Sequence, residues 1–159
     1  MSQPIVGTFT SRHMSVIVKD GTGTPITATL GPGPGDLTFG SLEESNTAAI
    51  KILNRGDFQE LVYGEDNEIP FSITCHMVGD QTGESISDAV MKTGNFASAV
   101  TKDPGGVVYA LDLVVTGTRG AVTAVYTLSN CRLKLDWSES LDGNKLSISG
   151  VCYSGCAIT

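Results

Sequence analysis

The segment that decides the fold is Ile69-Pro70-Phe71-Ser72-Ile73-Thr74-Cys75-His76-Met77, in which every odd-numbered residue is apolar. A period of two residues is typical of a β-strand with one buried and one solvated face. His76 falls on the solvated phase of this strand, and no nucleophile motif accompanies it, so we do not expect it to be catalytic. The segment predicts a half-buried strand of an antiparallel sheet.

The same alternation recurs near the C-terminus, in Cys131-Arg132-Leu133-Lys134-Leu135-Asp136-Trp137. Between these two segments and on either side of them, short β-branched or apolar runs alternate with Gly, Pro, Asn and Asp, which are typical of turns. The predicted strands span residues 14–19, 24–30, 37–39, 47–53, 58–63, 69–77, 107–115, 121–128, 131–137 and 145–153. Strands 47–53 and 58–63 form a hairpin across residues 54–57, and Gly150 is a candidate bulge in the last strand.

One segment, Ser85–Lys92, predicts a helix. Ser85 can cap its first turn, Asp88 and Lys92 match the helix dipole, and Gly94 is a natural stop. Many short strands and a single helix predict a mainly β fold. We expect an antiparallel β-sandwich or partly open barrel with one flanking α-helix.

The length of 159 residues fits one domain. We therefore predict a single domain over residues 1–159, with a polar N-terminal arm (1–13) and a short C-terminal arm (154–159). Both arms are expected to order only against a neighbouring subunit. No run approaches the roughly 20 apolar residues that span a bilayer, and no export signal is visible at the N-terminus.

The charge is unevenly distributed along the chain. Ten Lys and Arg against 17 Asp and Glu give a net charge of −7, which argues against a face that grips phosphate backbones. Residues 1–91 carry a net charge of −8 and residues 92–159 a net charge of +1, and eight acids without a base lie between Arg55 and Lys92. This acidic stretch is either a solvated surface or an interaction surface.

The four cysteines, Cys75, Cys131, Cys152 and Cys156, form no CxxC pair, and the two histidines, His13 and His76, form no spaced set with them. Because no export signal points to an oxidising compartment, we expect free structural thiols, with a disulfide or a metal site as the alternatives. The chain also lacks the short motifs of hydrolases, P-loop proteins, zinc proteases and EF-hands. We therefore predict no enzymatic activity, no cofactor and no metal.

The order of the segments is more informative than any single motif. Leu53-Asn54-Arg55-Gly56-Asp57 comes first, and an acidic stretch and the strand 69–77 follow it. The helix 85–92 with Thr93-Gly94 comes next, and then Ala124-Val125-Tyr126-Thr127-Leu128-Ser129-Asn130-Cys131. This order resembles that of the tail tube (major tail) proteins of long-tailed, siphovirus-like bacteriophages.

The resemblance implies a structural virion protein with a two-sheet β-fold and a flanking helix. Members of that family form hexameric rings that stack into a hollow tube, which conducts the double-stranded DNA genome during ejection. The implied partners are further copies of the chain and the tape measure, tail terminator and distal tail proteins, without a membrane. The implied location is the virion tail, assembled in the host bacterial cytoplasm.

The resemblance also places ring contacts between the hairpin near Arg55 and the strand that begins at Ile69. The acids in this region are lumen or inter-ring candidates, with solvated loop charge as the alternative: Glu60, Glu65, Asp66 and Glu68. Subunit-contact candidates are Arg12, His13, Arg55 and Asp57.

Three other functions compete with the tail tube. The first is the tube protein of a contractile injection or type VI secretion system, and the second is a capsid decoration or head–tail joining protein. The third is a monomeric β-sandwich binding module, for instance for carbohydrate. A carbohydrate module needs exposed aromatic side chains, whereas the nine Phe and Tyr and one Trp of this chain fall mostly on apolar phases of predicted strands.

Overall fold

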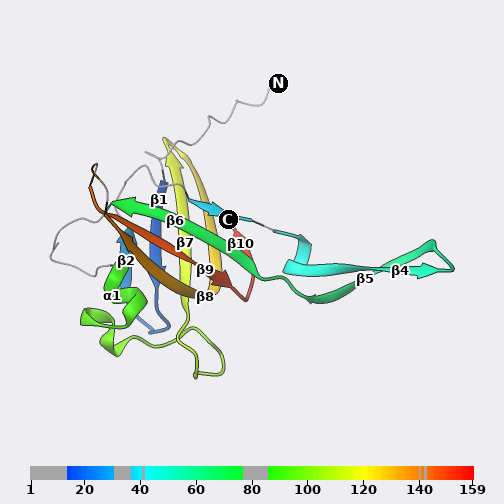
Figure 1. Cartoon of the computed structure of the whole chain (residues 1–159), viewed down its shortest axis with the longest axis horizontal. Coiled ribbons are helices and arrows are strands. Elements are labelled where there is room, and N and C mark those ends of the chain that lie inside the picture. The colour runs from blue at the N-terminus through cyan, green and yellow to red at the C-terminus, as the bar shows by residue number, and fades with distance from the viewer. Residues whose placement is uncertain (1–13, 31–36, 41, 77–85, 140, 142) are drawn as a thin grey trace.

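The computed structural model describes residues 14–30, 37–40, 42–76, 86–139, 141 and 143–159. The strands are β1 (Met14–Lys19), β2 (Thr27–Leu30), β3 (Thr38–Phe39), β4 (Thr47–Asn54), β5 (Asp57–Asp66), β6 (Ile69–His76), β7 (Leu111–Arg119), β8 (Val122–Ser138), β9 (Lys145–Cys152) and β10 (Cys156–Ile158). The helical elements are α1 (Ile86–Met91) and the 3-10 helices η2 (Glu44–Asn46) and η3 (Gly94–Ser98). Figure 1 shows a β-rich body from which β4 and β5 project as a long arm.

The body is one antiparallel sheet that folds back on itself. Its strand order is β2-β1-β7-β8-β9-β6-β3, with β10 on the edge of β8. The 17-residue strand β8 belongs to both layers, because its first half pairs with β7 and its second half with β9. The direction changes near Asn130, which has a left-handed φ of 54°, and the β7–β8 register shifts between Leu111 and Leu113. A bulge of this kind lets one strand turn from one layer into the next.

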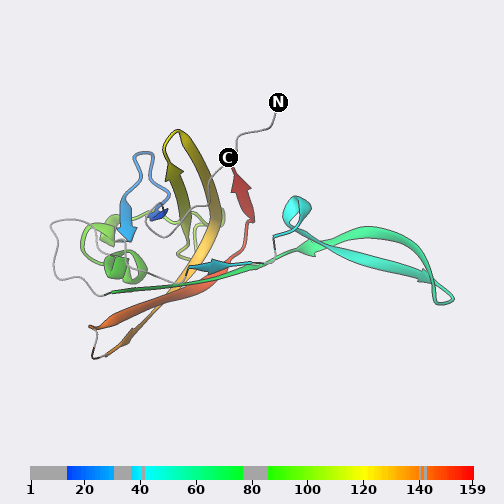
Figure 2. The ribbon, with the colours of Figure 1, turned by 90° about the horizontal axis from the view of Figure 1, so that it is seen from above.

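The core lies between the two layers (Figure 2). Its fully buried side chains come from both, among them Val18, Ile69, Leu113, Val115, Leu128 and Ile148. Helix α1 buries Ile86 and Ala89 beside β2, and the hydroxyl of Tyr109 donates to the carbonyl of Ala89 at 2.8 Å. The helix therefore covers part of the opening that the folded sheet leaves.

One buried carboxylate ties distant loops together. Asp20, fully buried after β1, accepts hydrogen bonds from the amides of Thr22, Ile26 and Val100 and from the hydroxyl of Thr22. Burial alone would raise the pKa of Asp20, but these hydrogen bonds outweigh it and hold the pKa below its ordinary value. The contact with Val100 joins the turn after β1 to the segment that follows η3.

The predicted fold class is confirmed: the described part of the chain is mainly β and antiparallel, with one α-helix and no closed barrel. Several boundaries differ from the prediction. The run 107–115 was expected to be strand throughout, but β7 begins at Leu111. The hydroxyl of Thr101 accepts the amide of Ala110 at 2.9 Å, which holds the preceding residues in a loop. Strands 121–128 and 131–137 are one continuous strand, β8.

The prediction of a bulge at Gly150 is wrong. Gly150 of β9 pairs in regular register with Phe71 of β6 on one side and with Leu133 of β8 on the other. A Cβ at this position would overlap the carbonyl oxygen of Arg132. The glycine is required by the close approach of the β8 backbone rather than by a bulge.

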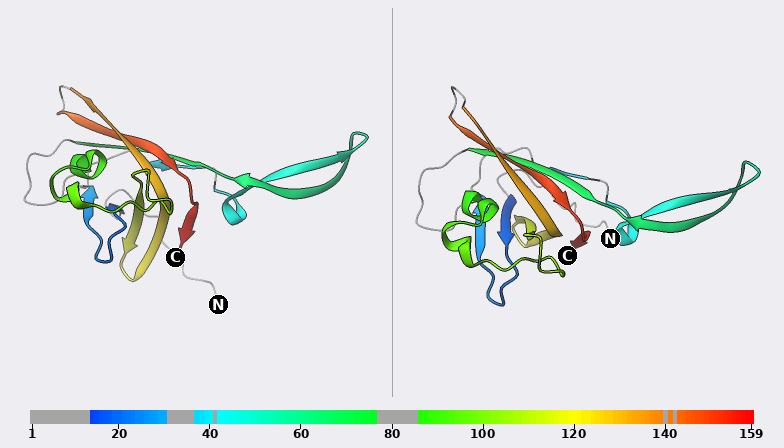
Figure 3. Two further views of the ribbon diagram at one scale, coloured as in Figure 1. Left: turned by 90° about the horizontal axis from the view of Figure 1, so that it is seen from below. Right: turned by 60° about the horizontal axis from the view of Figure 1, so that its bottom comes forward.

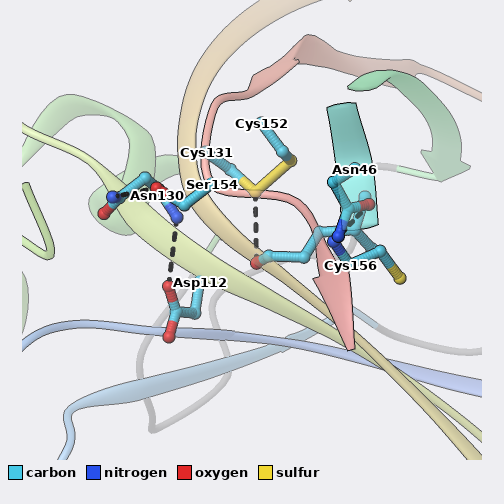
Figure 4. The surroundings of a disulfide bond; sticks show 8 residues. Asn46, Asp112, Asn130, Cys131, Cys152, Ser154 and Cys156 are labelled. Carbon is cyan, nitrogen blue, oxygen red and sulfur yellow. Dashed lines mark hydrogen bonds between the residues drawn. A yellow bond between two sulfur atoms is a disulfide. The ribbon is translucent and has the colours of Figure 1, made fainter. Parts of the chain in front are cut away.

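The expectation of free thiols is wrong for two of the cysteines, because Cys131 and Cys152 form a disulfide (Figure 4). They are direct partners in the β8–β9 register, and both are buried. Spacing along the chain could not reveal this pairing, since the register brings together residues that are 21 positions apart. Cys156 is a free thiol, and burial raises its pKa. The side chain of Cys75 lies outside the described part of the structure.

The C-terminal residues are also ordered within the chain. Strand β10 pairs with residues 126–128 of β8, and Thr159 and Val125 exchange backbone hydrogen bonds. The C-terminal arm expected at 154–159 therefore needs no neighbouring subunit to order it. The N-terminal arm, 1–13, lies outside the described residues.

Candidate functional site

The β4–β5 hairpin forms a separate two-stranded sheet that does not pair with the sheet of the body. Strand β5 continues through Asn67 and Glu68 into β6, so the hairpin extends sideways from the second layer (Figure 3). The turn residues Arg55 and Gly56 both have positive φ, 51° and 89°. Two such residues make the tight primed turn that joins antiparallel strands with the right twist. The sequence supplies it as Asn54-Arg55-Gly56-Asp57, as predicted.

Both faces of this hairpin carry exposed apolar side chains. The strand register places Ile50 opposite Val62 on one face, with Ile52 beside them. On the other face the register places Ala49 opposite Tyr63, Lys51 opposite Leu61 and Leu53 opposite Phe58. Phe58 and Tyr63 are each 63% exposed, Leu61 is 61% exposed and Ile50 is 48% exposed.

A two-stranded ribbon of this kind is not expected to be stable by itself in water. An isolated two-stranded hairpin is marginal in water, and a contiguous exposed apolar patch marks an interaction surface. The apolar side chains of the hairpin have no second layer of the described chain over them (Figure 1). We therefore treat the hairpin as the candidate functional surface.

The base of the hairpin is fixed to the body by Asn46. Its side-chain oxygen accepts the amide of Cys156 at 3.3 Å, and its carbonyl accepts the amide of Asn67 at 2.8 Å. Asn46 and the preceding Ser45 both adopt positive φ. Figure 4 shows Asn46 lying against the start of β10. Asn46 thus links the base of the hairpin to the start of β10, which lies 110 residues further along the sequence.

The structure separates the predicted site residues into two groups. Arg55, Asp57 and Glu60 lie at or near the tip of the hairpin, whereas Glu65, Asp66 and Glu68 lie near its base. All six are exposed. The acids therefore do not form one patch, as a single lumen surface would require. Arg12 and His13 lie outside the described residues.

A second surface feature lies where β8 bends, and we call it the bend pocket. It is a hollow of about 470 Å³ lined by Asp103, Pro104, Val108, Ala110, Asn130, Arg132, Tyr153 and Ser154. Asn130 shapes it: its amide N–H donates to Asp112 at 3.2 Å and its side-chain nitrogen donates to Ser154 at 2.6 Å (Figure 4). Sequence reasoning missed this feature because it assigned Val107 and Val108 to a strand. The available signal was Pro104-Gly105-Gly106, which marks a turn before them.

A smaller hollow adjoins the bend pocket on the side of α1. It has a volume of about 180 Å³ and includes Val90, Lys92, Tyr109 and Leu133 in its lining. The ammonium of Lys92 lies 5.4 Å from the centre of the Tyr109 ring, within cation–π distance. Burial and the nearby charge of Asp20 raise the pKa of Tyr109 to about 12, so its hydroxyl stays protonated and keeps its hydrogen bond to α1.

Within the described residues, no group of three or more His, Cys, Asp or Glu side chains could hold a metal ion. No described helix is long and apolar enough to cross a membrane. Two polar features remain: the exposed acids of β5 and the face of the second layer that points away from the core.

That outward face is rich in hydroxyl side chains. Ser72 on β6 pairs across the sheet with Ser149 on β9, and Thr74 pairs with Ser147. The exposed residues of β8 on the same face are Arg132, Lys134, Asp136 and Ser138. Figure 2 shows that the core elements lie on one side of this layer and that none of the described elements covers the other side.

Comparison with known proteins gives a fold-level likeness. No family model matches the chain, and no curated protein sequence matches it. Among solved structures, the chain is similar to the anti-feeding prophage cap, described as a tube terminating cap, seen by cryo-EM. The TM-score is 0.60 at 10% sequence identity, over 100% of this chain and 95% of that chain. The likeness therefore covers the whole fold, and the fold found here is also the fold of a protein that ends a tube.

Proposed function

We propose that the chain is a structural protein of a bacteriophage-type tail tube. Copies assemble into rings, hexameric by the family resemblance, and the rings stack into a tube that conducts double-stranded DNA. The observation that carries this proposal is the hairpin with two exposed apolar faces. The fold shared with a tube terminating cap supports the same assignment.

The energetics of the hairpin favour coverage of both faces. Seven large apolar side chains of β4 and β5 are exposed by roughly a third to two thirds: Ile50, Ile52, Leu53, Phe58, Leu61, Val62 and Tyr63. Burying the exposed part of each contributes about 1 kcal/mol, or about 7 kcal/mol in all. These side chains lie on both faces of the hairpin. The hairpin is therefore expected to lie between two neighbouring surfaces, as in a ring stack.

We assign the channel to the hydroxyl-rich outward face of β6, β9 and β8. The Ser and Thr side chains of this face carry no charge, and among them stand three bases, Arg132, Lys134 and Lys145, and one acid, Asp136. Among the described residues, the short strand β3 pairs with only two residues of β6 and leaves the rest of that edge unpaired, and an edge of this kind can pair with the next subunit. In this arrangement Glu60, Glu65, Asp66 and Glu68 take part in contacts between subunits rather than lining the lumen.

The rest of the assignment follows from the family resemblance. The protein would reside in the virion tail after assembly in the bacterial cytoplasm. Its partners would be the tape measure, tail terminator and distal tail proteins, and it would act without enzymatic activity, cofactor or membrane.

A second candidate is a protein that closes a tube instead of forming its length. The similarity to a tube terminating cap favours it. The two functions differ in one observable: a tube protein stacks ring on ring, whereas a cap forms a single ring that binds the end of a tube made by another protein. A tube protein of a contractile injection system is a third form of the same assignment.

Negative-stain microscopy and sedimentation velocity of the purified protein test the proposal. Tubes or stacked rings of uniform width support the tube protein, and isolated rings that do not stack support the cap. A monomer at every concentration and salt, without rings after prolonged incubation, would rule out both.

A further inference from the structure

We infer that the tip of the hairpin of one copy inserts into the bend pocket of a second copy. The tip is the segment Asn54–Phe58, and the bend pocket is the hollow defined above around Arg132. This inference rests on the proposed self-assembly and names the surfaces that meet. It goes beyond the general need to cover the hairpin, because it identifies an acceptor on the body.

The tip offers two opposite charges on an apolar support. Arg55 and Asp57 flank Gly56, and Leu53 pairs with Phe58 directly behind them. Both charged residues are exposed, and Phe58 is among the most exposed large apolar side chains of the described chain. The tip therefore needs an acceptor with one acid, one base and an apolar wall.

The bend pocket has that composition. It holds one carboxylate, Asp103, and one guanidinium, Arg132, and its apolar lining comes from Pro104, Val108 and Tyr153. Val108 and Tyr153 are each 48% exposed, so apolar surface remains to be covered. Arg55 of the tip matches Asp103, and Asp57 matches Arg132, as charge-assisted pairs between Arg and carboxylate. A hollow of about 470 Å³ is within the size range of binding pockets.

Both surfaces are held in place before they meet. The tip is a two-residue turn with positive φ at both positions. On the pocket side, the amide of Asp103 donates to the hydroxyl of Thr101 at 3.0 Å, and the Asp103 carboxylate accepts the amides of Val107 and Val108 at 3.4 Å. Surfaces ordered in advance lose less entropy on binding.

The geometry requires the partner to be another molecule. The hairpin directs its tip away from the body (Figures 1 and 3). The bend pocket is lined by residues of the body, from the loop before β7, from β8 and from the turn before β10. Donor and acceptor are different surfaces, so the contact is head-to-tail. A head-to-tail contact closes into a ring or continues as a filament, whereas a two-fold dimer uses the same surface twice.

Charge exchange tests the inference. The tip variant carries Arg55→Asp and Asp57→Arg, and the pocket variant carries Asp103→Arg and Arg132→Asp. Each variant alone should raise the concentration needed for assembly about tenfold or more, measured by sedimentation velocity. The variant with all four changes should restore assembly, because the pairs are re-formed with reversed sign.

The matched control for the single changes is Glu139→Lys, a charge reversal at an exposed residue outside the tip, the bend pocket and the outward face, and it should assemble as the wild type does. Arg132 donates to the carbonyl of Tyr109, so thermal unfolding checks that the pocket variant is folded. If Arg132→Asp prevents folding, the single changes Arg55→Asp and Asp103→Arg and their combination carry the same test.

Two further outcomes are decisive. If tip and pocket variants assemble normally while replacing Leu61 by Ser abolishes assembly, the tip does not enter the bend pocket and the proposed function stands. If the wild-type protein never assembles, the proposed function and this inference both fail.

Discussion

At the scale of single residues, Asp20 is the clearest case of a sequence position with a long-range structural task. An acid after a strand and before Gly-Thr-Gly is typical of a turn, and local hydrogen bonds to Thr22 and Ile26 fit that role. The bond to Val100, 80 residues away, does not follow from any local pattern. It depends on how the two layers fold over each other.

Replacing Asp20 by Asn is expected to lower the free energy of unfolding by about 2–3 kcal/mol at pH 7, because the buried amide groups lose a charged acceptor. The pKa of Asp20 in the folded protein lies below its unfolded value. Its contribution is therefore present above the unfolded pKa and is lost as pH falls through the folded pKa. Urea unfolding at pH 7 and at pH 3 and below should show the difference between wild type and variant shrinking in acid. A difference that stays constant with pH would contradict this role.

The Cys131–Cys152 disulfide predicts a measurable loss of stability on reduction. Closing a loop over 21 residues restricts the unfolded chain by about 3 kcal/mol. For a protein of this length that corresponds to a fall in Tm of roughly 6–12 °C in the variant with Ser at both positions. Thermal unfolding should show the same fall for wild type in reductant.

Cys156→Ser is the matched control, since it removes a cysteine and leaves the disulfide intact. It should melt close to the wild type. Peptide mapping that finds both Cys131 and Cys152 alkylated without prior reduction would contradict the pairing.

At the scale of elements, the hairpin is separable from the stability of the body. Replacing Phe58 and Leu61 by Ser should change the free energy of unfolding by less than about 0.5 kcal/mol, because exposed side chains away from the core contribute little. The same change should abolish assembly. By contrast, replacing the buried Leu128 by Ala should lower the free energy of unfolding by about 2–5 kcal/mol. A hairpin variant that assembles like wild type would contradict the role of its apolar faces.

The acids near the hairpin base give a separate prediction. Reversing Glu65, Asp66 and Glu68 to Lys should impair assembly, because these exposed residues lie where the hairpin joins the body and where neighbours would meet. Particle counts by negative-stain microscopy measure the effect, and genome ejection measures it in a virion. Normal particles with normal ejection would remove the role assigned to these three acids.

Local patterns predicted the elements that local chemistry determines. The strict alternation of 69–77 predicted β6 almost to its ends, and Arg55-Gly56 predicted the hairpin turn. Strand β10 was missed because Cys156–Ile158 is too short for a period to be visible, and it is a strand only because β8 lies beside it. The disulfide and the bend pocket were missed for the same reason, since strand register and the β8 bend create both.

The sequence of the β4–β5 hairpin contains a signal that this hairpin contacts a partner. Ile52-Leu53 and Leu61-Val62-Tyr63 are runs of consecutive apolar residues, so these strands place apolar side chains on both faces, unlike the half-buried strands of the body. A strand with apolar residues on both faces needs cover on both faces. In a two-stranded ribbon that projects from the body, the described part of the chain does not supply this cover, which is why the pattern points to a partner.

At the scale of the whole molecule, most of the negative charge lies on the part of the chain that projects from the body. Residues 43–68 hold seven acids and two bases, a net charge of −5 out of −7 for the chain. Most of the excess negative charge therefore lies on the projecting hairpin and its base, while the outward face of β6, β9 and β8 carries three bases, Arg132, Lys134 and Lys145, and one acid, Asp136. The inferred contact between the hairpin tip and the bend pocket joins two different surfaces, and such a contact leads to head-to-tail assembly.

The most direct test of this account is a cryo-EM map of the assembled particles. The account predicts that β4 and β5 of each subunit are covered on both faces by neighbouring subunits, and that Ser72, Ser149 and Lys134 face a central channel. A map in which the hairpins stand free in solvent, or in which the copies enclose no channel, would contradict it.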